Sequence, residues 1–367
     1  MEPYISDDLP IKDLDYTRLI GFVGQANAEL ARYDGLLQGI VNPTILLSPL
    51  TTQEAVLSSK IEGTQATLDE VLEHEAGMKI EGEKEKDIQE IVNYRKSLMA
   101  AKDVVAERPI SLGLLRQMHS ILLDSVRGSK KSPGEFRKTQ NYIGRPGATI
   151  EQASFVPPSP MQLMNFLEQW ETYICGSDVD VLIQAAVTHA QFEILHPFND
   201  GNGRIGRLLI PLFLFQKKCI SSPMFYLSEY LEEHRDEYYS ALRGVTQEKD
   251  WNTWVSFFLE AVATQARKNT MKVRKIMALY EDMKKRITEI TRSQYAIKIL
   301  DALFDYPVFS TSDFLRQTGI PKQTAMPLVQ KIRDAHILKS LREASGTVPA
   351  ILVFSDLLNI AEGKKVL

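Results

Sequence analysis

The sequence predicts a mostly α-helical protein with small β elements. Through most of the chain, apolar residues recur three or four positions apart, which is the spacing of helices that bury one face. The stretch from Trp251 to about Ile290 has neither glycine nor proline, so we expect one long helix or two nearly continuous helices there. Between Ser125 and Pro160 the helical period disappears, and short strand-like runs occur near the C-terminus. At 367 residues, the chain is long enough for two or three domains.

Charge and composition argue against several classes of protein. The net charge is −4, which gives no global attraction to nucleic acid or to an anionic membrane. The acidic start, Met1 to Asp8, lacks the apolar run of a signal peptide, and no stretch reaches the ~20 apolar residues of a membrane span. The two cysteines, Cys175 and Cys219, are far apart and predict buried thiols rather than a disulfide. We therefore expect a soluble, cytoplasmic protein with no membrane partner.

Helix signals begin early in the chain. A helix is expected from Tyr16 to Leu37, and Asn42-Pro43 should break any helical structure that precedes it. Thr51 followed by Glu54 has the form of a capping box, so a second helix should begin there and end at Gly63.

Two further helices should follow. A second capping box, Thr67 with Glu70, predicts a short helix, and a charged, glycine-containing loop should cover residues 76–87. A long helix should then end before Pro109, and Ser111 should cap the helix after it.

The segment without helical period predicts an extended hairpin. Residues 132–137 form a turn-rich entry, and residues 139–156 are expected to make two short strands around Gly144-Arg145-Pro146-Gly147. The exposed edge of such a hairpin offers N–H and C=O groups with which another chain can pair. A surface hairpin without a partner is the alternative.

A polar loop lies between two apolar helices at the centre of the chain. The helices are expected at Val179 to Leu195 and at about Asn202 to Gln216, and Pro211 should kink the second one. Gly201 and Gly203 let backbone N–H groups approach an anion closely, and the N-terminus of the second helix faces the same place.

Charged side chains complete this loop. Arg204 and Arg207 are three residues apart and fall on one side of the first turn of the helix. Asp200 is a hard oxygen ligand suited to Mg²⁺, and His196 is the nearby group that can take a proton near neutral pH. Together these residues predict a cradle for a polyphosphate, with a metal and a base beside it.

The stretch His196-Pro197-Phe198-Asn199-Asp200-Gly201-Asn202-Gly203-Arg204-Ile205-Gly206-Arg207 also carries a family resemblance. For Gly-Asn-Gly alone, a glycine turn between core helices with solvent-facing arginines is the favoured interpretation. The whole stretch, however, resembles the signature of the Fic family, His-Pro-Phe-x-Asp/Glu-Gly-Asn-Gly-Arg-x-x-Arg, and matches it at every specified position.

The resemblance implies a Fic-fold protein adenylyltransferase, which moves AMP from ATP to a Ser, Thr or Tyr hydroxyl of a target protein and releases pyrophosphate. His196 would be the base, Asp200 would hold Mg²⁺, and Arg204 and Arg207 would bind the outer phosphates. The residues that the resemblance places at ATP are Glu62, His196, Gly201, Asn202, Gly203, Arg204, Ile205, Gly206, Arg207 and Tyr239.

A second motif lies at the end of the helix that precedes Gly63. On its own, Glu62 would be a solvated carboxylate, poorly placed in the last turn because the helix dipole disfavours negative charge there. The stretch resembles the inhibitory motif of the Fic family, Ser/Thr-x-x-x-Glu-Gly/Asn, with Ser58 and Glu62 in register. The resemblance implies that Glu62 pairs with Arg207 and inhibits the enzyme.

The resemblance also bears on partners. In the family, the hairpin at 139–156 is a flap over the active site that aligns a segment of the target protein by strand addition. Self-modification and assembly with a second copy are further expectations.

After the central helices, Ser228 should cap a helix that carries three tyrosines. Tyr230 is expected in the core. Tyr238 and Tyr239 lie where related proteins place a tyrosine against adenine, and Tyr239 is the one we expect to line the base pocket.

The last part of the chain resembles a winged helix. Helices are expected at 295–304, from Ser310 or Thr311 to Gln317, and at 322–335, followed by strand-like runs at 337–339 and 350–354. Winged helices bind DNA or proteins. Because the local positive charge is modest, DNA binding is not favoured, although the helix at 322–335 could present these residues to a groove: Lys322, Gln323, Lys331 and Arg333.

We expect four parts: an N-terminal helical region with the inhibitory helix at 1–105, a catalytic core at 106–262, a connecting helix at 263–290 and the winged-helix-like part at 291–367. Two other functions stay open. One is a winged-helix regulator whose Fic-like core only senses nucleotide. The other is a Fic-fold enzyme with different phosphotransfer chemistry, which Gly203 disfavours because the kinase-like variant of the signature has lysine there.

Overall fold

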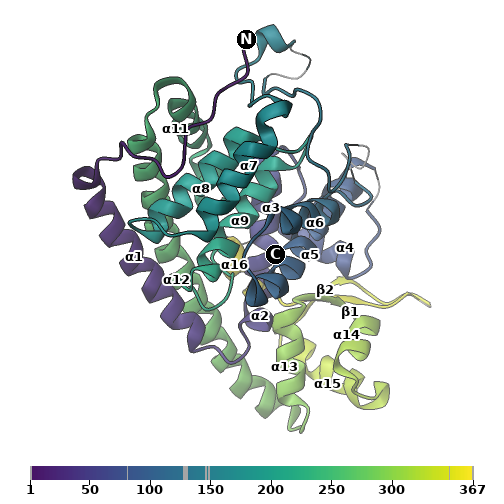
Figure 1. Ribbon diagram of the computed structural model, residues 1–367. Helices are drawn as coiled ribbons and strands as arrows, with labels where there is room; N and C mark the ends of the chain where they lie inside the picture. Colours follow the sequence, from purple (N-terminus) through teal and green to yellow (C-terminus); the bar gives the residue numbers. More distant parts are fainter. Residues whose placement is uncertain are drawn as a thin grey trace.

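The computed structural model describes residues 2–80, 82–126, 131–144, 147, 149–346 and 348–365, and most of these residues are helical (Figure 1). In chain order the helices are α1 (Tyr16–Gln38), α2 (Pro43–Leu46), α3 (Ser48–Ile61), α4 (Leu68–Glu75), α5 (Glu83–Glu107), α6 (Leu112–Leu122), the 3₁₀ turn η1 (Ile150–Gln152), α7 (Pro160–Cys175), α8 (Val181–Leu195), α9 (Asn202–Gln216), α10 (Ser228–Glu233), α11 (Arg235–Glu248), α12 (Trp251–Thr291), α13 (Ala296–Asp305), α14 (Thr311–Thr318), α15 (Lys322–Asp334) and α16 (Ser355–Glu362). The strands are β1 (Val308–Ser310), β2 (Lys339–Arg342) and β3 (Ile351–Val353).

The core is built around α8 and α9, which pack against each other. Thirteen of the fifteen residues of α8 are buried, because the helix is apolar on all sides and is covered by its neighbours. Two buried tryptophans attach these neighbours: the Trp170 indole N–H donates to the Thr188 carbonyl and the Trp254 indole N–H donates to the Ala186 carbonyl. Helices α7 and α12 are thereby held on α8, and the loop between α8 and α9 has a rigid support.

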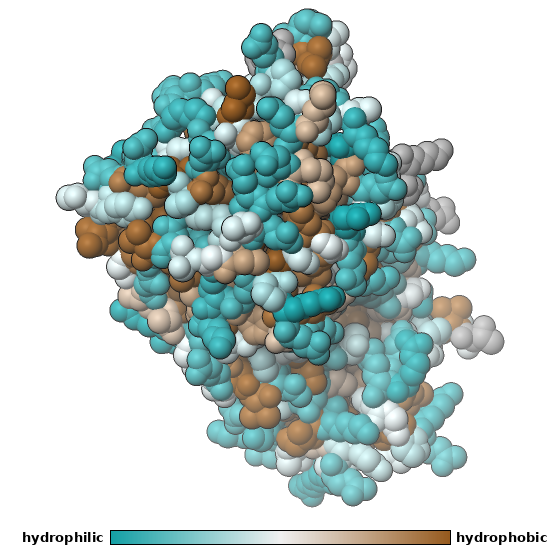
Figure 2. Space-filling model, viewed as in Figure 1, coloured by the Kyte–Doolittle hydropathy of each residue, from teal (hydrophilic) through white to brown (hydrophobic). Residues whose placement is uncertain are grey.

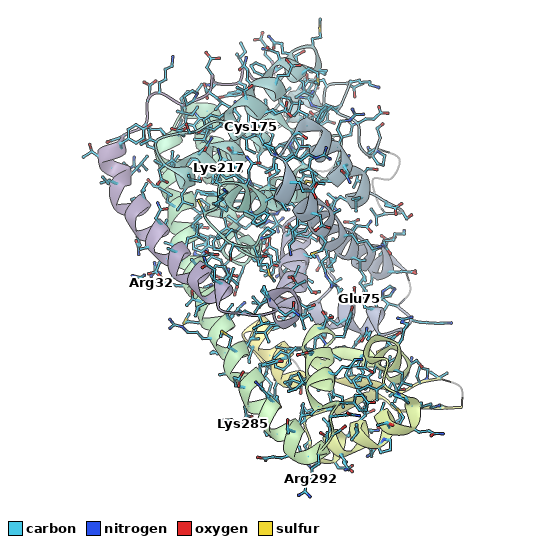
Figure 3. All side chains as sticks on the ribbon, turned by 60° about the horizontal axis from the view of Figure 1, so that its bottom comes forward. Arg32, Glu75, Cys175, Lys217, Lys285 and Arg292 are labelled. Carbon is cyan, nitrogen blue, oxygen red and sulfur yellow. The ribbon has the colours of Figure 1, made fainter. Side chains whose placement is uncertain are left out.

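The uninterrupted stretch predicted after Trp251 is a single helix, α12, and α1 packs along it (Figure 1). Its far end carries Lys285 and, as the left-handed cap, Arg292, next to the C-terminal elements (Figure 3). The long helix therefore connects the core with the last part of the chain.

The C-terminal elements form a small three-stranded antiparallel sheet with four helices, and they rest on α2, α3 and α4. The predicted helices are present, and Ser310 caps α14 by accepting from the Asp313 N–H. Strand β3 lies within the predicted run at 350–354, whereas β2 begins at Lys339, the last residue of the run predicted at 337–339. The sequence did not predict β1 or α16. Strand β1 has three residues and pairs with β3 more than forty positions later, so no local signal marks it.

The capping box predicted at Thr67 and Glu70 is present, but the one predicted at Thr51 and Glu54 is wrong. Helix α3 begins one turn earlier, at Ser48, with Pro49 in its first turn. Glu54 therefore points into the core, where its carboxylate accepts hydrogen bonds from the Ser228 N–H and hydroxyl and from the Tyr94 hydroxyl.

The predicted two-stranded hairpin at 139–156 is also corrected. Its described residues contain one antiparallel bridge, between Ile143 and Phe155, and the turn η1 instead of two strands. Arg145 and Pro146 of the expected turn lie outside the described residues. The turn η1 takes up residues that the second strand would need, so the described pairing consists of this one bridge.

Three smaller predictions are wrong. Ser228 is the first residue of α10 and not its cap, and the tyrosines lie on two helices, with Tyr230 on α10 and Tyr238 and Tyr239 on α11. Cys175 is exposed at the end of α7, beside Lys217, whereas Cys219 is half-buried, and both are free thiols (Figure 3). Helix α5 starts at Glu83, inside the predicted loop.

The face shown in Figure 2 mixes hydrophilic residues with scattered apolar ones. Among the described residues, no helix combines the length and the apolar character needed to span a bilayer.

Candidate active site

The loop between α8 and α9 is fixed by its own backbone. His196 ends α8 in the left-handed conformation, with φ of 45°, while its N–H still donates to the Phe192 carbonyl at 3.1 Å. Asn202 then closes the loop, because its side-chain amide accepts from the Phe198 N–H and donates to the Phe198 carbonyl, both at 2.8 Å. His196 and the start of α9 are therefore held in one rigid turn.

The two signature glycines are required at their positions. Gly201 has φ of 75°, and a Cβ there would meet Leu122 at 3.2 Å. Gly203 lies in the first turn of α9, and a Cβ on it would lie 2.2 Å from Oε1 of Glu62. The first N–H groups of the helix, which have no partner within it, are thus open to a close anion.

The His196 imidazole is suited to accept a proton. Its Nδ1 lies 3.3 Å from the Glu193 carbonyl, and because a carbonyl only accepts, Nδ1 carries the hydrogen and leaves the lone pair of Nε2 free. Burial lowers the pKa of His196 to about 4. The ring is therefore neutral at physiological pH, as a base must be before it acts.

Arg137, which was not predicted as a site residue, holds the backbone of His196. Its Nε donates to the His196 carbonyl at 3.0 Å, and its Nη2 donates to the Pro158 carbonyl at 2.5 Å and the Leu195 carbonyl at 3.3 Å. The side chain is 3 % exposed, and burial lowers its pKa to about 10. The guanidinium thus joins the two ends of the 139–156 segment to the end of α8.

Arg204 faces the cradle but is already paired. Its Nη1 lies 2.8 Å from Oε2 of Glu90 on α5, and each side chain is 5 % exposed. Its Nη2 lies 3.4 Å from Oδ1 of Asp200, a residue whose side chain is 39 % exposed. Glu90 escaped the sequence analysis because it is one of many charged residues in a long helix.

Arg207 makes the contact that the inhibitory-motif resemblance implies. Its Nη2 lies 2.7 Å from Oε1 of Glu62 and 2.9 Å from the Ser58 carbonyl, and its Nε donates to the Ser58 hydroxyl at 2.8 Å. Burial raises the pKa of the Glu62 carboxyl, but the charge and hydrogen bond of Arg207 outweigh this effect, so its pKa lies below the usual range. The same pair keeps the pKa of Arg207 above its ordinary value despite burial.

The two candidate tyrosines have different surroundings. Tyr238 is buried, with its hydroxyl 3.0 Å from Nε2 of His189, so it belongs to the core. Tyr239 is half-buried, lies under the Arg235 guanidinium at 6.0 Å from ring centroid to Cζ, and interacts electrostatically with Glu62 and Arg207. Of the two, Tyr239 is the one that is partly exposed.

Glu193 is a third site residue, after Arg137 and Glu90, that the sequence analysis missed. A Cβ on Gly206 would lie 2.2 Å from Oε1 of Glu193, and this oxygen is buried with no hydrogen-bond partner among the described residues. Burial raises the pKa of the Glu193 carboxyl to about 7. A single glutamate near the end of an apolar helix carries no signal that distinguishes it from a surface residue.

No cluster of three or more His, Cys, Asp or Glu side chains suited to a metal ion occurs in the described part of the chain. A metal bound here would therefore need ligands from the nucleotide in addition to Asp200.

The comparisons with known proteins agree with this geometry. Residues 109–214 match the Fic/DOC family, and residues 21–103 match the Fic/DOC family N-terminal region. Together the two matches span more than half of the 367 residues and include both motifs.

Curated relatives share less than a third of their residues with this chain over the aligned regions. A probable protein adenylyltransferase of Aquifex aeolicus is 26 % identical over 207 residues, which are 54 % of this chain and 55 % of that protein. The protein adenylyltransferase fic-1 of Caenorhabditis elegans is 29 % identical over 174 residues, which are 46 % of this chain and 31 % of that protein. The chain thus spans about half or less of the length of these relatives.

Solved structures show the same fold. A Fic family protein of Desulfovibrio desulfuricans G20 superposes with a TM-score of 0.60 at 18 % identity, covering 96 % of this chain and 98 % of that one. A Fic-domain-containing signalling protein of Bacteroides thetaiotaomicron gives a TM-score of 0.54 at 18 % identity, covering 68 % and 97 %. By its two matched regions, its signature loop and its fold, the chain belongs to the Fic/DOC family.

Proposed function

We propose that this protein is a protein adenylyltransferase that transfers AMP from ATP to a hydroxyl side chain of a target protein. The observation that carries the proposal is the neutral His196 imidazole, with Nε2 free, held in one rigid turn with the glycine-lined N-terminus of α9. The names of the curated relatives support the same reaction.

The reaction needs a bound phosphate chain, an attacking hydroxyl and a base. The first N–H groups of α9 and the Gly201–Gly203 backbone would bind phosphate oxygens. The target hydroxyl oxygen would attack the α-phosphorus while Nε2 of His196 takes its proton. The bond from that phosphorus to the bridging oxygen would break, and pyrophosphate would leave as AMP stays on the target.

Asp200 would hold the Mg²⁺ ion. Its Oδ1 accepts a hydrogen bond from the Gly201 N–H at 2.6 Å, and its side chain is 39 % exposed. One carboxylate together with phosphate oxygens is a common Mg²⁺ arrangement. Bound there, the ion would neutralise phosphate charge and orient the leaving group.

Glu62 would inhibit this reaction. Its carboxylate lies at Gly203 and accepts a hydrogen bond from Nη2 of Arg207, a donor that would otherwise be available to an outer phosphate. ATP would then bind without its outer phosphate held and without the alignment for attack. Removal of the carboxylate would restore the productive pose.

Two parts of the molecule, the 139–156 segment and the C-terminal elements, are proposed to contact partners. The extended segment at 139–156 would align a segment of the target, and the protein itself is one expected target. The C-terminal order of helix, strand, two helices and hairpin is that of a winged helix, which we propose as a protein-contact module because it already rests on α2, α3 and α4. A second copy of the chain would be one such partner.

Labelled ATP tests the reaction. The Glu62→Gly variant, incubated with Mg²⁺ and ATP labelled at the α-phosphate, should retain label on protein, whereas label at the γ-phosphate should leave with pyrophosphate. The matched control is Glu62→Gly with His196→Ala. Retention of the γ-label would show phosphorylation instead, and ATP binding without transfer of either label would support a nucleotide-sensing role.

A further inference from the structure

Glu193 is a carboxyl group at the candidate nucleotide site that the reaction above leaves without a role. It lies on α8, one turn before His196, and its Oε1 rests against the bare backbone of Gly206 on α9. Glu62 rests in the same way against Gly203, one turn earlier on α9. Two carboxyl groups from different parts of the chain therefore lie against successive turns of α9, close to Arg207.

The charged and titratable groups that influence Glu193 come from three elements besides its own. Helix α9 contributes Arg207, the end of α3 contributes Glu62, and α11 contributes Tyr238 and Tyr239. Arg207 is already occupied by Glu62 and Ser58. Oε1 of Glu193 is buried and has no hydrogen-bond partner among the residues that the structure describes, which is costly for a polar atom unless a ligand completes the site.

We propose that Glu193 contacts the bound nucleotide as a neutral carboxyl group, whose O–H donates a hydrogen bond to a phosphate oxygen beside Arg207. The inference rests on the proposed function, because it takes the Glu62 carboxylate to mark the place of the outer phosphate. An ionised Glu193 would repel that phosphate, whereas the protonated group supplies a hydrogen-bond donor. Oε1 of Glu193 has no hydrogen-bond partner among the described residues.

Electrostatics favours this protonation state. Burial raises the pKa of Glu193 to about 7 even though the charge of Arg207 lowers it, and the Glu62 carboxylate contributes to the rise. A polyphosphate brings more negative charge than the single Glu62 carboxylate that it would replace. The pKa should therefore rise when the nucleotide binds, so that nucleotide binding takes up a proton and weakens as the pH increases.

The test measures binding alone, so that it does not depend on AMP transfer. Isothermal titration of α,β-methylene-ATP with Mg²⁺ is compared between Glu62→Gly and Glu62→Gly with Glu193→Gln, at pH 6 and pH 8 and in two buffers of different ionisation enthalpy. The glutamine amide keeps a donor but does not titrate. Asp305→Asn in the Glu62→Gly background is the control, because burial raises the pKa of this distant carboxyl to about 6.

With Glu193 present, the dissociation constant should rise about tenfold more from pH 6 to pH 8 than with glutamine, and proton uptake near pH 7 should disappear in the glutamine variant. Asp305→Asn should change neither. A second variant, Gly206→Ala, displaces the carboxyl group by its methyl and should also remove the pH dependence.

Equal pH dependence in the two proteins, with equal proton uptake, would overturn the proposal. So would weaker binding of the glutamine variant at every pH together with a loss of discrimination between ATP and 2′-deoxy-ATP, since this pair of results would make Glu193 an ionised acceptor for a ribose hydroxyl. The α-label experiment decides the transferase activity separately, whichever result is obtained here.

Discussion

Oε1 of Glu62 lies 2.7 Å from Nη2 of Arg207 and 2.2 Å from the place where Gly203 would carry a Cβ, so one carboxylate covers both the last arginine and the second glycine of the signature. Ser58, one turn earlier on α3, holds the same guanidinium through its hydroxyl and its carbonyl. Arg207 is 2 % exposed in this arrangement, whereas Glu62 is 35 % exposed. The arginine is buried and held by contacts to two residues, whereas the glutamate is the more exposed partner.

Replacing His196 by alanine should reduce AMP transfer by about 10²- to 10⁴-fold, the usual contribution of a general base. ATP affinity should change little, because the phosphates are held by backbone N–H groups and arginines. Single-turnover transfer and equilibrium ATP binding, both in the Glu62→Gly background, check this. Transfer within a few-fold of the parent would rule out His196 as the base.

The pH profile of transfer should reflect the buried state of His196. Burial lowers its pKa to about 4, so the neutral, active form is present above that pH and is lost as the pH falls through it. Initial rates at saturating ATP from pH 3.5 to 7 should show their acidic limb near 4, with circular dichroism as the check on folding. An acidic limb near 6.5, the ordinary value for histidine, would contradict this environment.

Asp200→Asn should weaken Mg²⁺ binding and lower the activity together. The amide keeps the shape of the side chain and an acceptor for the Gly201 N–H but loses the charge that attracts the ion. A Mg²⁺ titration of transfer by the variant should give a higher midpoint than the parent. The same midpoint at reduced activity would place the metal elsewhere.

Arg137→Lys should lower kcat with little change in KM for ATP, because lysine keeps the charge but cannot hold the His196, Leu195 and Pro158 carbonyls at once. A loss of about 2 kcal/mol in the free energy of unfolding is expected from the lost charge-assisted hydrogen bonds. A positioning role also predicts a changed acidic limb of the pH profile. Lower stability with an unchanged kcat and profile would mean that Arg137 is only structural.

Where the signal is local, the sequence predicted the secondary structure around the site. The loop between α8 and α9 and the start of α9 at Asn202 follow from residues that are adjacent in the chain. Glu62 and Arg207 are 145 positions apart, and only the resemblance brought them together before the structure did.

Two of the residues that were missed, Glu90 and Arg137, act through distant contacts. Glu90 reaches Arg204 across 114 positions, and Arg137 reaches His196 across 59. Neither stands out from the charged residues of its own segment, so only tertiary packing reveals them. The error at Thr51 has the same origin. The Glu54 carboxylate accepts a hydrogen bond from the Ser228 hydroxyl, 174 positions away, and does not cap its own helix.

Inhibition by Glu62 is tested most directly by initial rates of α-label transfer at saturating ATP and Mg²⁺. The rates are compared among the wild type, Glu62→Gly, and Glu62→Gly with Arg207→Ala. If the productive arrangement is populated at about 1 % in the wild type, removing the carboxylate should raise the rate by up to ~100-fold. The double variant should lose this gain, because the freed arginine is what the outer phosphate uses. Equal rates for the wild type and Glu62→Gly with the same target would contradict inhibition by Glu62, and no α-label on protein in any variant would contradict the transferase itself.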